Sequence, residues 1–67
     1  MIRTQLIKAL ARKYEADIAS ARATALIYLE NSAGIGEHND IVESIDKELD
    51  ALASAEDKLN VLIKHFS

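Results

Sequence analysis

The chain has 67 residues, no cysteine and a formal net charge of −3, so it forms at most one domain and has neither a disulfide nor a thiolate metal site. A chain of this length buries only about 60% of its unfolded surface, and small scaffolds usually need a metal, a disulfide or a partner for stability. We therefore expect the missing burial to come from a second copy of the chain or from another protein.

A first helix is expected over residues of about 4–31. This segment is rich in Ala, Leu, Lys, Arg and Glu and contains neither Gly nor Pro. Its apolar stripe is close to an eleven-residue repeat, which predicts a nearly straight helix. The part of the hairpin core expected from this helix is Ile7, Leu10, Tyr14, Ile18, Ala21, Ala25 and Leu29.

Residues 32–39 are expected to connect this helix to a second one over residues of about 40–65. Gly34 suits a helix C-cap, and the chain then carries an unbroken seven-residue register to its end. Only Glu56 interrupts the apolar positions of that register. The core residues expected from the second helix are Val42, Ile45, Leu49, Leu52, Leu59, Ile63 and Phe66.

The two helices are nearly equal in length, which predicts an all-α, coiled-coil-like antiparallel hairpin over residues 1–67. Folding the chain at its centre places one apolar stripe against the other. In this arrangement Glu56 faces Tyr14, with Arg12 close by. Because a carboxylate in an apolar seam needs polar partners, these three residues are the expected polar register contact.

A second apolar stripe lies outside this expected core. Alanine-rich faces allow helices to approach closely, and exposed apolar patches often mark association sites. We expect the hairpin to form a homodimer, a four-helix bundle, through this stripe, and another protein remains a possible partner. The expected oligomer interface is Ala16, Ala19, Ala23, Leu26, Ile27, Ile41, Ala55 and Leu62.

Charge is distributed unevenly, with a net +2 over residues 1–32 and −5 over residues 33–67. Attraction between the two packed helices is one explanation. The alternative is a regulator that binds nucleic acid through the basic start of the first helix. The residues of that alternative face are Arg3, Lys8, Arg12 and Lys13.

No motif for catalysis, for a cofactor or for a metal stands out. Glu37, His38 and Asp40 lie close together in sequence, but zinc sites take three or four ligands at defined spacing, and acids at a helix start are commonly capping groups. The expected function is therefore that of a small non-enzymatic interaction or structural protein, without a cofactor. The longest apolar run, residues 25–29, is far shorter than the roughly 20 residues of a membrane span, so no membrane partner is expected. No signal peptide is visible, and a cytoplasmic location is expected.

Three short stretches resemble small helical-hairpin proteins of large contractile-tailed phages. They are residues 13–18 (KYEADI), 33–41 (AGIGEHNDI) and 55–59 (AEDKL), and the resemblance covers residues of about 13–62. Those proteins often carry a proline where this chain has Asn39. The resemblance implies a viral accessory or assembly role in the host cytoplasm, and it implies no catalytic residues, because no activity is assigned to that family.

Overall fold

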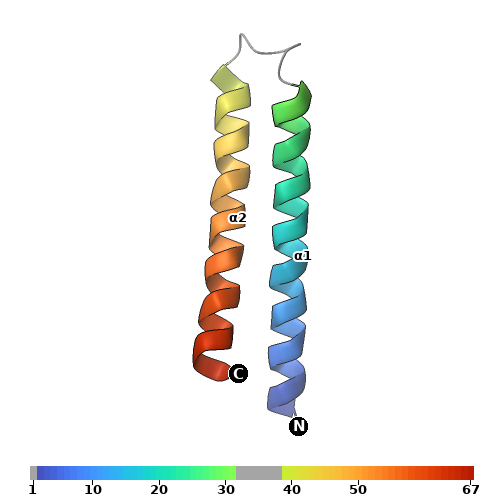
Figure 1. The fold of residues 1–67 in the computed structure, drawn as a ribbon, viewed down its shortest axis with the longest axis vertical. Helices are drawn as coiled ribbons and strands as arrows, with labels where there is room; N and C mark the ends of the chain where they lie inside the picture. The colour runs from blue at the N-terminus through green and yellow to red at the C-terminus, as the bar shows by residue number, and fades with distance from the viewer. Residues whose placement is uncertain (1, 32–38) are drawn as a thin grey trace.

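The computed structural model describes residues 2–31 and 39–67, which form two antiparallel α-helices lying side by side (Figure 1). Helix α1 spans Ile2–Asn31 and helix α2 spans Asn39–Phe66. The molecule measures 52 × 15 × 12 Å, and its radius of gyration of 15.4 Å exceeds the about 11 Å of a compact domain of this length. The predicted all-α hairpin is confirmed, while the connection expected around Gly34 lies outside the described residues.

The ends of α2 carry charges that complement its dipole. Asp40 lies in the first turn, and Lys64 and His65 lie in the last turn. The guanidinium of Arg3, at the start of α1, donates a hydrogen bond of 3.0 Å from Nη2 to the backbone carbonyl of Phe66. This bond joins the two chain ends and satisfies a carbonyl that has no partner within the helix. We call this end of the hairpin, where Ile2 and Phe66 lie, the open end.

Both helices contribute a seven-residue repeat to the seam between them. Along α1 and along α2 the buried and half-buried seam residues alternate at spacings of four and three, so the same side of each helix returns to the seam every seven residues. The α1 seam is Ile7, Ala11, Tyr14, Ile18, Ala21, Ala25 and Tyr28, and the α2 seam is Ile41, Ile45, Glu48, Leu52, Ala55, Leu59 and Leu62.

The structure corrects the core expected for α1 at two positions. Leu10 and Leu29 are exposed, and Ala11 and Tyr28 occupy the seam in their place. A strict seven-residue repeat keeps the seam of α1 in contact with the seven-residue repeat of α2 over the whole length of the hairpin. An eleven-residue repeat would drift away from it, which explains why the expected stripe does not hold at Leu10 and Leu29.

The structure also corrects the core expected for α2. Ile45, Leu52 and Leu59 lie in the seam as expected, but at positions 42, 49, 56 and 63 the neighbouring residue toward the N-terminus takes the place of the expected one. Ala55 replaces Glu56, which leaves the carboxylate in solvent and avoids the free-energy cost of burying it. The residues expected in the core and found exposed are Val42, Leu49, Ile63 and Phe66.

The core of one hairpin is thin. In residues 2–31 and 39–67, five apolar side chains are buried, and three of them are alanines: Ala21, Ala25 and Ala55. Among the described residues, no side chain is completely enclosed. Since alanine removes little apolar surface from water, the free energy gained by closing this seam is small for the number of residues that it orders.

Candidate functional site

A row of large apolar side chains runs along α2 beside the seam and in contact with solvent. Val42 is 67% exposed, Leu49 is 50% exposed and Ile63 is 54% exposed. They recur every seven or fourteen residues, so they lie in line along the helix, and Glu56 occupies the remaining position of the row. The sequence pattern predicted these residues to lie in the hairpin core, and in the single hairpin they are exposed to solvent.

Helix geometry places this row on one flank of the hairpin. On the opposite flank, Asp17 and Ser20 of α1 line a shallow hollow together with Ala51 and Lys58 of α2. Residues that follow the seam positions 41, 48, 55 and 62 must lie away from that hollow, on the other side of the seam. We call the side of Val42, Leu49, Glu56 and Ile63 the apolar flank, and the side of Asp17 and Lys58 the polar flank.

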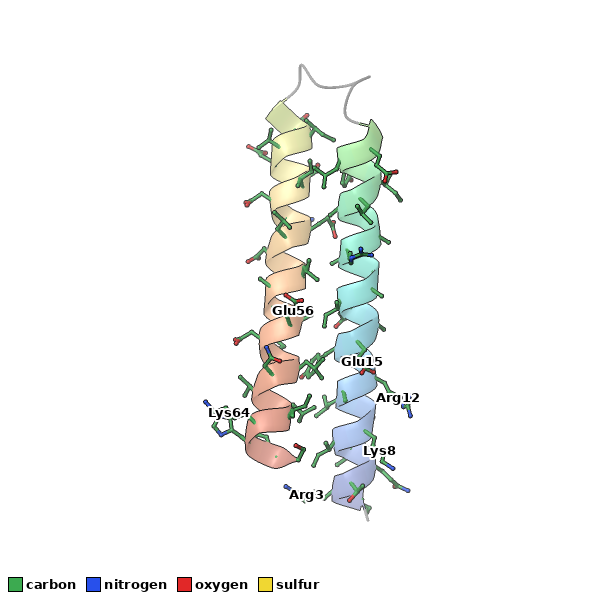
Figure 2. The ribbon with its side chains drawn as sticks, viewed as in Figure 1. Arg3, Lys8, Arg12, Glu15, Glu56 and Lys64 are labelled. Carbon is green, nitrogen blue, oxygen red and sulfur yellow. The ribbon has the colours of Figure 1, made fainter. Side chains whose placement is uncertain are left out.

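Three charged residues of α1 border the apolar flank at the same seven-residue spacing. They are Lys8, Glu15 and Arg22, and each follows a seam residue. Figure 2 shows Glu15 and Glu56 over their own helices, on the face turned toward the viewer, whereas Lys8 extends away from α2. Among the described residues, no ion pair involves Glu15, Arg22 or Glu56, so these charges have no partner within one hairpin.

The expected oligomer interface is divided by the structure. Ile41, Ala55 and Leu62 are buried inside the hairpin seam, so they are unavailable to a second molecule, and that part of the expectation is corrected. The cause is the one-residue shift of the α2 seam described above. The remaining members, Ala16, Ala19, Ala23, Leu26 and Ile27, are exposed on α1.

The expected polar register contact is absent from the described residues. Glu56 is exposed on the apolar flank, while Tyr14 is half-buried in the seam. Arg12 extends away from α2 in Figure 2. The alignment of α1 against α2 is instead consistent with packing of the seam residues, because both helices keep the same seven-residue spacing.

The four cations of the alternative nucleic-acid face do not gather on one side of α1. Successive residues of a helix are about 100° apart, which places Arg3, Lys8 and Lys13 on three different sides, with Arg12 beside Lys8. Arg3 already bonds the end of α2. Lys13 Nζ lies 2.8 Å from Asp17 Oδ2, and the hydrogen bond and charge of that carboxylate raise the pKa of Lys13.

A groove at the open end is a feature that the sequence pattern did not indicate. Its volume is about 450 Å³, and it is lined by Ile2, Leu6 and Leu10 of α1 and by Leu62 and Phe66 of α2. The signal was present in part, because Ile2, Leu6 and Leu10 recur every four residues and so share one side of a helix. The groove is almost entirely apolar and open to solvent, so it offers contact area and no reactive groups.

Other kinds of site receive little support from the described residues. No three His, Cys, Asp or Glu side chains within residues 2–31 and 39–67 are placed to hold a metal ion, and Glu37 and His38 lie outside these ranges. Neither α1 nor α2, over the same residues, is long and apolar enough to cross a bilayer.

No protein-family model, curated protein or solved structure matches the chain. The resemblance to phage proteins therefore stays a prediction.

Proposed function

We propose that this chain is a small non-enzymatic interaction or structural protein that self-associates through its apolar flank into a four-helix bundle. The observation that carries the proposal is the exposed row of Val42, Leu49 and Ile63 beside a core made largely of alanine. A surface row of this kind is typical of a helix that packs against more than one neighbour. A phage accessory or assembly role in the cytoplasm is compatible with the proposal and rests on the sequence resemblance alone.

Association would supply the apolar burial that one hairpin lacks. Ile18 of α1 and Ile45, Leu52 and Leu59 of α2 are only half-buried in the seam, and part of each faces the apolar flank. A second hairpin on this flank would cover them together with the exposed row. Buried apolar area stabilises by roughly 25 cal/mol per Å², so each covered side chain adds to a small total.

Folding and association are expected to be coupled. Because the dimer is stabilised by mass action, its melting temperature should rise with protein concentration, whereas that of a monomer should not. Circular dichroism melts across a hundredfold range of concentration would measure this. A melting temperature that does not change over the range, with full helicity throughout, would contradict the proposed self-association.

The arrangement of the cations does not favour nucleic-acid binding. It needs a continuous basic surface that neutralises several phosphates. Here the cations of α1 point to different sides, and two of them already contact other groups of the chain.

A further inference from the structure

Charges on the apolar flank are arranged in layers along the hairpin. Arg3 bonds Phe66, and Ile7 lines a groove with Leu62, so residues of α1 and α2 whose numbers add up to about 70 lie at the same height. Glu15 and Glu56 therefore share a layer near the middle of the hairpin.

The neighbouring layers along the flank differ in character. We call the end of the hairpin opposite the open end the connecting end. Seven residues from Glu15 and Glu56 in that direction, Arg22 shares a layer with Leu49. Seven residues from Glu15 and Glu56 toward the open end, Lys8 shares a layer with Ile63.

Two identical hairpins can meet through this flank in two ways. A two-fold axis parallel to the helices places α1 on α2 of the second copy, with both connecting ends at the same end of the bundle. A two-fold axis perpendicular to the helices places α1 on α1 and α2 on α2, with the connecting ends at opposite ends. Neighbouring helices are antiparallel in both bundles, so helix direction does not choose between them.

The same-end bundle places like charges in the same layer. Glu15 and Glu56 of one copy would meet Glu15 and Glu56 of the other, which brings four carboxylates together in a layer shielded from water. Arg22 would meet Leu49 of the second copy, one repeat away from those carboxylates. Like charges at such distances repel, and the repulsion grows as water is excluded.

The opposite-end bundle pairs unlike charges. An axis crossing near Ile18 of α1 and Leu52 of α2 places Arg22 of the second copy opposite Glu15, at the same height as Glu56. The same axis places Leu49 of the second copy opposite Glu56, and Val42 of the second copy opposite Ile63. One axis position thus pairs Glu15 with Arg22 between the two α1 helices and Val42 with Ile63 between the two α2 helices. Arginine suits this place because its planar guanidinium can donate to two carboxylate groups.

We propose that the apolar flank binds a second copy of this chain in the opposite-end orientation, selected by Arg22 of each copy meeting Glu15 and Glu56 of the other. This inference rests on the proposed self-association and adds its orientation. Charge complementarity on the flank is the observation that carries it, since the exposed apolar row is covered by a second copy in either bundle and helix direction is the same in both.

Distances between spin labels on Asp50→Cys and on Lys64→Cys, prepared separately, test the orientation. Both sites are exposed and lie on the side of α2 away from the seam, and the chain has no other cysteine. At a rise of 1.5 Å per residue, the opposite-end bundle separates the two copies of residue 50 by about 8 Å along the axis and those of residue 64 by about 35 Å. The label-to-label distance should therefore be about 20 Å longer at residue 64.

Equal distances at the two sites, within a few Å, would overturn the orientation and leave self-association standing, because a same-end bundle separates both pairs only sideways. Absence of any intermolecular distance, with a monomeric mass, would overturn both proposals. These readings need no knowledge of label length, since one site serves as the reference for the other.

Charge reversal gives a second, independent test. Glu15→Arg places arginine against Arg22 of the second copy and Arg22→Glu places glutamate against two carboxylates, so each single variant should raise the dimer Kd about tenfold or more. The double variant restores opposite charges and should recover most of the affinity. In a same-end bundle Glu15→Arg would tighten the dimer instead, by dispersing four carboxylates, and that sign would overturn the proposal.

Discussion

Replacing Leu49 with glutamate is expected to weaken self-association by about 100-fold or more. Full burial of a leucine stabilises by about 1.5–3 kcal/mol, and Leu49 is half-covered in one hairpin, so each copy loses about 0.7–1.5 kcal/mol of burial and the symmetric dimer loses twice that. The new carboxylate, placed in the interface opposite Glu56 of the second copy, adds the cost of its desolvation and of charge repulsion. Sedimentation equilibrium of the wild type and the variant would measure the change in Kd. At micromolar concentration the variant should also lose helicity, because its thin core is left without support.

Leu6→Glu is the matched control for that substitution. Leu6 is 59% exposed, similar to Leu49, but it lies at the groove of the open end and away from the apolar flank. The same chemical change there should leave the Kd within about threefold of the wild type, as expected for a surface position outside the interface. Equal losses at the two positions would show that the apolar flank has no special role.

Leu62→Ala is expected to have the largest effect on the stability of the hairpin itself. Leu62 is 8% exposed and is one of two large side chains among the buried residues. Its truncation removes apolar contacts and leaves a cavity, with an expected loss of about 2–3 kcal/mol per chain in the free energy of unfolding. That is a large fraction of the total for so small a domain, and urea unfolding followed by circular dichroism would measure it.

Val61→Ala is the control at the adjacent position. Val61 is 44% exposed and lines a hollow with Lys58 on the polar flank, so its truncation should change the free energy of unfolding by less than about 0.5 kcal/mol. Similar losses for both variants would contradict the seam described above. A larger loss for Val61→Ala than for Leu62→Ala would show that the side of α2 that contains Val61, and not the side that contains Leu62, packs against α1.

The hairpin could be predicted from the sequence because helix formers, a central pair of glycines and two apolar stripes all indicate the same architecture. The side of α2 that faces α1 could not be predicted from the sequence. Two seven-residue seams share Ile45, Leu52 and Leu59 and differ only in the alternate positions. The more apolar of them contains Val42 and Leu49, and the choice depends on what else the helix packs against.

In a four-helix bundle both α2 seams can be satisfied at once. The residues shared by the two seams would lie at the centre, one set of alternate positions would face α1, and the other would face the second hairpin. A helix whose apolar surface is too wide for one neighbouring helix is therefore expected to pack against two. Such a surface is present in the sequence, where Ile41 and Leu62 lie beside the expected seam, among the residues predicted to contact a second copy.

For α1, the predicted core depended on the repeat length chosen for its apolar stripe. Leu10 and Leu29 are larger and more apolar than Ala11, so a stripe drawn through the most hydrophobic residues follows an eleven-residue pattern. Packing instead favours a small residue where two helices approach closely, and the seam of α1 accordingly contains three alanines. The spread of the basic residues around α1 also follows directly from helix geometry, although their closeness in sequence suggested one face.

The central claim is that the hairpin exists as one half of a symmetric bundle. The most direct test is the absolute mass in solution, measured by light scattering on a sizing column over a dilution series. We expect a mass twice that of the 7.4 kDa chain, giving way on dilution to a species of lower mass and lower helicity. A fully helical, stable monomer at every concentration would contradict the claim, because the exposed row on α2 would then need no second copy.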